Sequence, residues 1–196
     1  CWQIVTNIDR DHLDRHGNLA NIRRLFAEFM SIGDPEGFLI YGSDTEELPE
    51  LAQHFPGATR SFGLDDEHAF YHASNVGYTA DFRSTAELQI DGRFAGTLSL
   101  ALPGRHNLSN AVAAIGMAHS MGVEPDAAIE ALTDFSGIER RFQLLYHREP
   151  LRVFEDYAHH PTEIRAALQG ARDLFPHARL MAVFQPHLPS RTKLLL

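Results

Sequence analysis

The side chains best suited to chemistry first gather near the amino terminus, in the stretch TNIDRDHLDRHGN that follows an apolar, strand-like start. Magnesium prefers oxygen ligands in octahedral geometry, so one imidazole with carboxylates, water and phosphate oxygens would form a workable shell. The other interpretation is a solvated loop whose aspartates cap the helix that follows. The spacing leaves both open, and His12 is the best candidate for a metal ligand. Its titratable neighbours in this stretch are Asp9, Asp11, Asp14 and His16.

A second polar group lies in GRHNLSNAVAA, which places His106, Asn107 and Asn110 at a predicted helix start. Two carboxamides one helical turn apart could read the edge of a planar base, because each offers a donor and an acceptor. Taken alone, however, the motif is better explained with Asn107 as an ordinary N-cap.

Two adjacent arginines, Arg140 and Arg141, stand in IERRFQ, which we interpret as part of a strand. Neighbouring side chains in a strand point to opposite faces, so one arginine would be structural. The other could hold a phosphate with its bidentate guanidinium. A solvated surface pair fits the sequence equally well.

The stretch VFEDYAHHPTEI carries Asp156, His159 and His160 between a predicted strand and a helix that begins near Pro161. Free N–H groups and the helix dipole favour an anion at such a position. A zinc ion is the competing interpretation for a histidine pair, although adjacent residues rarely bind one ion together. A phosphate-binding loop of the pattern GxxxxGK(S/T) does not occur in this sequence, whose single lysine is Lys193.

The elements that must position these residues alternate between strands and helices at both ends of the chain, around an antiparallel insert. From residue 58 to 102 short segments alternate with turn signals, and Asp91-Gly92 is a strong hairpin signal. This order predicts an α/β fold with a mainly parallel sheet, flanking helices and a small antiparallel meander. Further expected elements are a helix over 18–30, a strand over 37–44, a weak helix over 45–55 interrupted by Pro49, helices over 107–122, 124–135 and 161–175, and strands over 140–146, 151–157 and 179–184.

The polar turn near residue 147 predicts a boundary between a domain over 1–147 and the start of a second α/β domain over 148–196. The net charge of −9 argues against general nucleic-acid binding. No apolar run approaches the length of a membrane span, so we expect no membrane insertion. A single cysteine, Cys1, forms no internal disulfide, which fits the cytoplasm. Both ends look cut through ordered structure, so we expect an internal fragment. Nothing in the sequence indicates an oligomeric state.

Taken together and in order, five motifs resemble the Mur ligases. They span Thr6 to Lys193, and although each is weak alone, the ordered set is specific. The most similar branch adds L-alanine to UDP-N-acetylmuramate, and the branch that recycles whole tripeptides ranks second. The motifs are TNIDRDHLDRHG, GRHNLSNAVAAIGMA, FSGIERRFQ, DYAHHPTEI and FQPHLPSRTK.

This resemblance implies a three-domain, ATP-dependent acid–amino-acid ligase of peptidoglycan precursor synthesis. The chain would hold the late part of the central ATP- and Mg²⁺-binding domain, without its phosphate-binding loop, and the start of a Rossmann-like C-terminal domain. By itself such a piece should be inactive. The roles implied are magnesium binding for His12, adenine contact for His106, Asn107 and Asn110, phosphate contact for Arg141, ribose contact for Asp156, and amino-acid contact for His159 and Arg191.

Two positions depart from the pattern of the resemblance. Leu188 stands where an arginine is usual, which leaves more of the amino-acid recognition to Arg191. Glu155 replaces a usual aspartate. Several other branches use a carbamylated lysine downstream of the metal histidine, and the absence of a lysine there resembles the alanine-adding branch. Two other functions remain open: a non-catalytic relative that binds a nucleotide or wall precursor, and a metal hydrolase built on His12 with the histidine pair.

Overall fold

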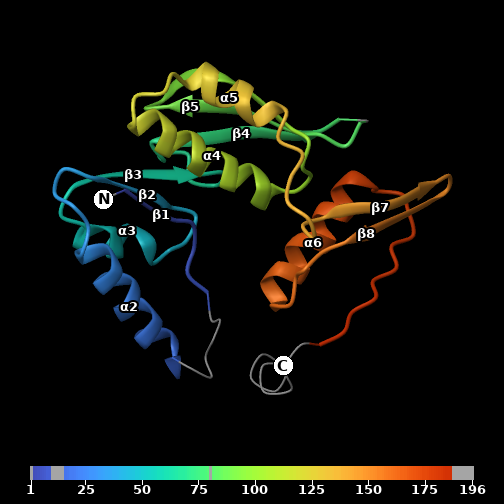
Figure 1. Ribbon diagram of the computed structural model, residues 1–196, viewed down its shortest axis with the longest axis horizontal. Helices are drawn as coiled ribbons and strands as arrows, with labels where there is room; N and C mark the ends of the chain where they lie inside the picture. The colour runs from blue at the N-terminus through green and yellow to red at the C-terminus, as the bar shows by residue number, and fades with distance from the viewer. Residues whose placement is uncertain (1, 10–15, 80, 187–196) are drawn as a thin grey trace.

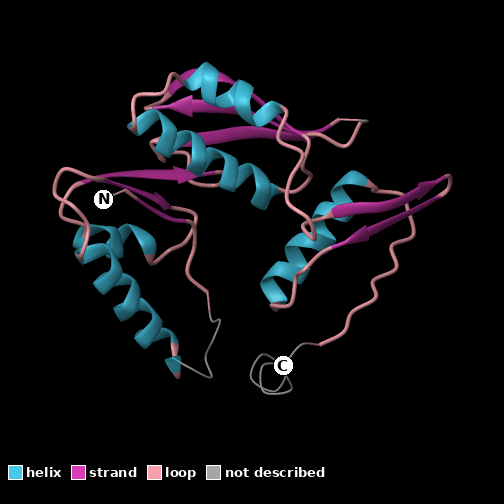
Figure 2. Cartoon of the chain, viewed as in Figure 1, coloured by secondary structure: helices cyan, strands magenta, loops and turns pink. Residues whose placement is uncertain are grey.

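Two sheets of unequal size organise the protein (Figures 1 and 2). The computed structural model describes residues 2–9, 16–79 and 81–186. The larger sheet has six strands in the order β1 to β6, and the smaller one pairs β7 with β8. The strands of the larger sheet are β1 (Gln3–Val5), β2 (Phe38–Gly42), β3 (Ala58–Gly63), β4 (Tyr71–Tyr78), β5 (Ser84–Ile90) and β6 (Arg93–Leu100).

The larger sheet is parallel from β1 to β4 and antiparallel from β4 to β6. This confirms the mainly parallel sheet with its antiparallel meander. The hairpin between β5 and β6 turns at the predicted dipeptide, where Asp91 has φ 49° and Gly92 has φ 70°. Positive φ at both central residues is what a tight two-residue hairpin requires, and aspartate followed by glycine supplies it at low cost.

Helix α4 (Arg105–Ser120) covers the middle of the larger sheet and forms the main core with it. Tyr71, Leu88, Leu108 and Ile115 are fully buried there. The helix comes closest to the sheet at Gly116, which has no side chain. A Cβ on Gly116 would come within 2.9 Å of the Tyr71 ring, so glycine is needed at this contact. Helix α5 (Pro125–Thr133) packs beside α4 and on β6, and starts at Pro125 as predicted.

A second core cluster lies where α2 (Leu19–Ser31), α3 (Leu48–Leu51) and the 3₁₀ turn η1 (Ala52–His54) meet β2. The α2 helix was predicted, but its buried residues are Ile22 and Met30, whereas Leu25 and Phe29 are more than one-third exposed. Pro49 does not interrupt a helix: it occupies the first turn of α3, where its missing N–H has no helical partner to lose.

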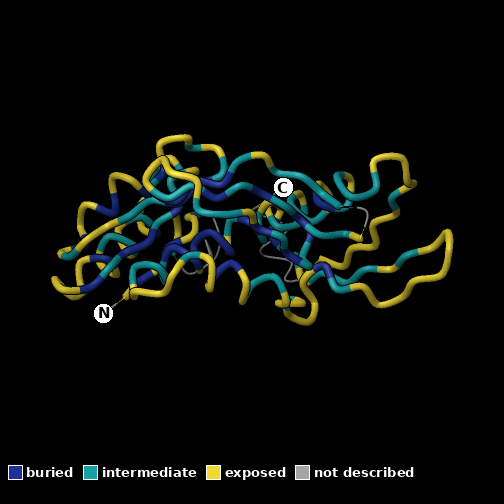
Figure 3. Tube along the Cα trace, turned by 90° about the horizontal axis from the view of Figure 1, so that it is seen from above, coloured by how far each residue is buried: buried dark blue, intermediate teal, exposed yellow. Residues whose placement is uncertain are grey.

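The smaller unit joins the antiparallel pair β7 (Gln143–Arg148) and β8 (Leu151–Glu155) to helix α6 (Pro161–Leu174). Its hairpin is mostly exposed (Figure 3). The boundary expected after residue 147 falls inside β7. The strand expected over 179–184 is absent from the described residues, and Met181 and Val183 are 78% and 99% exposed. A strand needs a neighbour to bond its backbone, and none lies beside this segment in the described chain.

No helix in the described part of the chain combines the length and the apolar character needed to cross a membrane.

Candidate active site

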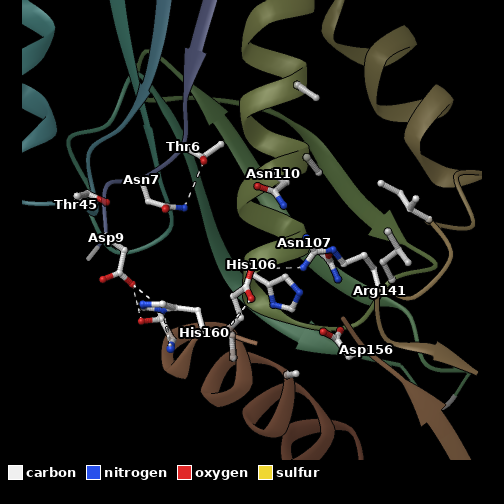
Figure 4. A pocket seen from close by; sticks show the side chains of 18 of the residues that line it. Thr6, Asn7, Asp9, Thr45, His106, Asn107, Asn110, Arg141, Asp156 and His160 are labelled. Atoms are coloured by element: carbon white, nitrogen blue, oxygen red, sulfur yellow. Dashed lines mark hydrogen bonds and ion pairs between the residues drawn. The ribbon is translucent and has the colours of Figure 1, made fainter. Parts of the chain in front are cut away.

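A cleft of about 1090 Å³ lies between the two units and gathers four of the motifs (Figure 4). The carboxyl ends of β1, β2 and β6 run into it, as expected for a site in an α/β sheet. The opposite wall is the first half of α6. Of the residues singled out from the sequence, those lining the cleft are Asp9, His16, His106, Asn107, Asn110, Arg141, Asp156 and His160.

The first motif reaches the cleft directly after β1. Asp9 accepts a hydrogen bond from the Thr162 hydroxyl at 2.6 Å, and its Oδ2 lies 3.6 Å from Nδ1 of His160 (Figure 4). Asp9 therefore links the larger unit to the start of α6. Asp11, His12 and Asp14 lie outside the described residues, so the predicted metal ligand His12 is not placed. Within the described ranges no three His, Cys, Asp or Glu side chains are grouped as for a metal ion.

The amino terminus of α4 forms the second side of the cleft. Its N-cap is Gly104, at φ 103°, so Asn107 is not the N-cap. Instead the Asn107 amide donates to the Pro103 carbonyl at 2.7 Å and holds the entry loop in place. Asn110 follows one turn later and is exposed to the cleft.

His106 stands between this helix start and the second unit (Figure 4). Burial lowers the pKa of its imidazole, since a charged ring would lose its hydration. The Asp156 carboxylate opposes this shift in pKa, and the Arg141 guanidinium reinforces it. The ring is therefore neutral near pH 7, and can offer one donor and one acceptor to a ligand.

The two arginines do not lie in a strand, contrary to expectation. Arg140 has φ 62°, so the chain turns here and β7 begins only at Gln143. Arg140 points toward Glu155, at 3.3 Å, and its Cζ lies 4.7 Å from the centre of the Tyr157 ring. Arg141 instead lines the cleft and is half-exposed there. The turn thus separates the two side chains as alternation in a strand would have done.

Arg141 also lies 3.8 Å from Glu163, a residue of α6 that sequence reasoning did not single out. Burial by itself would raise the pKa of Glu163. The backbone amides of His159 and His160, together with the charges of His159 and Arg141, outweigh burial and lower that pKa. Glu163 is therefore an anion beside Arg141, whose side chain stays half-exposed in the cleft.

Asp156 joins the turn around Arg141 to the loop before α6. Its carboxylate accepts from the backbone N–H of Phe142 at 2.9 Å and from that of Ala158 at 2.7 Å. It also faces the cleft (Figure 4). Each oxygen keeps a second lone pair, so the group can order these loops and still accept a hydrogen bond from a ligand.

The two histidines of the last described motif have different surroundings. The ring of His159 packs edge-on to Tyr157 with centroids 5.3 Å apart, and His159 does not line the cleft. His160 lines the cleft and caps α6, with Nδ1 accepting from the Thr162 N–H at 3.3 Å. The residue is only 6% exposed, and its Nε2 has no hydrogen-bond partner among the described residues.

An Nδ1 that accepts leaves the proton of a neutral ring on Nε2, so this unpaired atom is a donor. The capping role of His160 could be read from the sequence, because the residue before a helix-opening proline is the natural N-cap. Arg191, the other residue expected to contact an amino acid, lies outside the described residues.

Comparison with known proteins agrees with this arrangement. A family model described as the Mur ligase middle domain matches residues 2–118, and one described as the Mur ligase glutamate ligase domain matches residues 140–194. A UDP-N-acetylmuramate–L-alanine ligase of Alkaliphilus metalliredigens is 37% identical over 193 residues, covering 98% of this chain. The chain spans 42% of that relative's length.

Two solved structures have the same arrangement of elements. The crystal structure of a UDP-N-acetylmuramate-alanine ligase from Thermotoga maritima superposes with a TM-score of 0.77 at 30% identity, covering 98% of this chain and 43% of that one. A MurF ligase from Thermotoga maritima in complex with ADP gives a TM-score of 0.76 at 17% identity, covering 88% of this chain and 39% of that one. At this identity the similarity shows a shared fold alone. With the middle-domain model matching more than half of its residues, the chain belongs to the Mur ligase family.

Proposed function

We propose that the protein is an ATP-dependent ligase that joins L-alanine to UDP-N-acetylmuramate in peptidoglycan precursor synthesis. The observation that carries the proposal is the single cleft in which the α4 amino terminus, Arg141 and the α6 amino terminus converge. The names of the relatives support alanine as the amino acid. The reaction consumes ATP and a UDP-sugar, so we place the protein in the cytoplasm. We also propose that the larger unit is the ATP-binding domain and that the smaller one begins a Rossmann-like domain.

The residues present fit a nucleotide. Asn107, Asn110 and neutral His106 offer donors and acceptors to the adenine at the α4 amino terminus. Asp156 has free lone pairs for the ribose hydroxyls, and Arg141 is placed for the phosphates because its guanidinium is half-exposed in the cleft. We assign His12 as a magnesium ligand, since its motif starts at the cleft with Asp9. When bound, the ion would neutralise charge on the crowded phosphate oxygens.

The proposed reaction has two steps. A muramoyl carboxylate oxygen attacks the γ-phosphorus of ATP, and ADP leaves. The alanine amine then attacks the acyl carbon, and the C–O bond breaks to release phosphate. Arg141 stabilises the negative charge that accumulates during the first step. His160 caps α6 and lies beside Asp9, so it holds the amino terminus of α6 at the cleft.

Amino-acid recognition is the part of the site that rests most on the resemblance. We assign it to Arg191 and His159, and add His160, which is the member of the pair that lines the cleft. The anionic carboxylate of alanine suits an arginine, whose guanidinium can bind it with two hydrogen bonds.

The test is phosphate release by the intact protein with Mg·ATP. Release that requires both UDP-N-acetylmuramate and L-alanine would support the proposal. Release with a tripeptide in place of L-alanine would assign the protein to the recycling branch. ATP binding with no release in any mixture would identify a non-catalytic nucleotide-binding relative.

A further inference from the structure

The loop of the β4–β5 hairpin contacts the second unit at the carboxyl end of α6 (Figure 1). The Phe82 ring lies 5.3 Å from that of Phe175. The Tyr78 hydroxyl donates to Asp173 at 3.3 Å. Arg152 completes the contact, with its Cζ 5.3 Å from the Phe82 ring centre and 5.5 Å from that of Phe175.

The backbone at Phe82 is unusual for a residue of its size. Its φ is 65°, in the left-handed region where glycine or asparagine is normal and a bulky side chain is strained. The turn keeps Phe82 there through a hydrogen bond from its N–H to the Thr79 carbonyl at 3.0 Å. An aromatic side chain in this conformation indicates that its contact with the second unit offsets the strain of the backbone.

The base of the hairpin is held firmly on the larger unit. Arg83 donates to the Ser99 hydroxyl at 2.8 Å, to the Ser99 carbonyl at 2.7 Å and to the Thr133 carbonyl at 2.7 Å. These bonds tie the hairpin to β6 and to the end of α5. Phe82 is therefore held firmly on the larger unit. Its contact with Phe175 fixes the position of α6 more than it fixes the position of the hairpin.

Helix α6 connects this contact to the cleft. Thr162, Glu163 and Ala166 line the cleft in its first half. Further along the same helix, a Cβ on Gly170 would lie 3.5 Å from the Cα of Gly104, which caps α4. The helix thus lies across the larger unit from Asp9 at one end to the hairpin at the other, a span of about 20 Å for 14 residues.

We propose that Phe82 and Tyr78 are positioning residues, which seat the carboxyl end of α6 on the larger unit and so hold His160 and Glu163 at the cleft. This inference rests on the proposed ligase function. Neither residue lines the cleft, so both act through the helix. Displacement of a catalytic group by 1 Å can cost about 10²-fold in rate, so small tilts of α6 are sufficient.

The experiment compares Phe82→Ala with Phe94→Ala in the intact protein. Phe94 makes a matched control because it also lies in a hairpin of the larger sheet, but is 67% exposed. We expect Phe82→Ala to lower kcat by about 10- to 100-fold, to change the KM for ATP much less, and to speed amide exchange in α6. Phe94→Ala should leave all three unchanged, and Phe82→Tyr should restore both kcat and exchange.

Tyr78→Phe removes one hydroxyl without opening space, so it keeps the test valid if Phe82→Ala fails to fold. We expect it to speed exchange at the carboxyl end of α6. Unchanged exchange in α6 for both variants would overturn the positioning role. Faster exchange in a protein without ligase activity would support the positioning role and remove the proposed function instead.

Discussion

Replacing Asp156 with asparagine should destabilise the junction between the two units. The wild-type carboxylate accepts from the N–H groups of Phe142 and Ala158, one on each oxygen. Asparagine has nearly the same shape, but one oxygen becomes an amide that donates. One of the two backbone N–H groups then faces another donor, whichever way the side chain turns.

The size of the effect follows from these bonds. A hydrogen bond to a charged group contributes about 1.5–3 kcal/mol, and the partial exposure of Asp156 favours the lower end of that range. For a chain of this size, about 1.5–2 kcal/mol corresponds to a fall in Tm of about 3–8 °C. The kcat should fall as well, because one of these amides, that of Phe142, directly follows Arg141 in the chain.

Glu155→Gln provides the control, since it makes the same chemical change one residue earlier. Glu155 pairs with Arg140 at 3.3 Å, with both side chains exposed by 40% or more, so the pair contributes about 0–1 kcal/mol. Thermal unfolding of the intact protein, followed by fluorescence, distinguishes the two variants. Equal melting temperatures for Asp156→Asn and the wild type would refute the argument that this carboxylate orders the junction.

Arg141→Ala should lower kcat by about 10²–10³ with little change in the KM for alanine, and steady-state kinetics with an unchanged kcat would assign Arg141 to structure. Because folding lowers the pKa of His106, the imidazole in the unfolded chain takes up a proton at a higher pH than the folded one does. The stability of the protein should therefore decrease as pH falls below about 6.5. His106→Asn should flatten this part of a plot of Tm against pH. The pKa of Glu163 is also lowered, so its contribution is present above about pH 4.5 and lost as pH falls through the folded value. Glu163→Gln should therefore reduce the loss of stability below that pH. If Tm depends on pH in the same way in the variant and the wild type, the role given to the amide contacts of Glu163 is contradicted.

Local signals with a single physical cause were predicted correctly from the sequence. Asp91-Gly92 fixed the hairpin because few other dipeptides accept two positive φ angles. Pro125 and Pro161 marked helix starts because proline fits the first turn and little else in a helix. The carboxyl ends of parallel strands then placed the motifs at one edge of the sheet.

Features that depend on tertiary contacts were missed. The residues around Arg140 read as a strand, but the chain turns there at a positive φ that no residue type announced. The segment 179–184 has the apolar pattern of a strand, yet lies exposed because pairing requires a neighbouring strand. Which histidine of the pair faces the cleft depends on how α6 docks, and adjacent residues of identical type give no hint of it.

The measurement that tests the central claim most directly follows oxygen from substrate to product. UDP-N-acetylmuramate labelled with ¹⁸O in its muramoyl carboxylate would be incubated with the intact protein, Mg·ATP and L-alanine. If the carboxylate attacks ATP and phosphate then leaves from the acyl carbon, the released phosphate carries one ¹⁸O from the substrate. Phosphate whose fourth oxygen comes from water, with the label retained by the sugar nucleotide, would contradict the proposed reaction at this cleft.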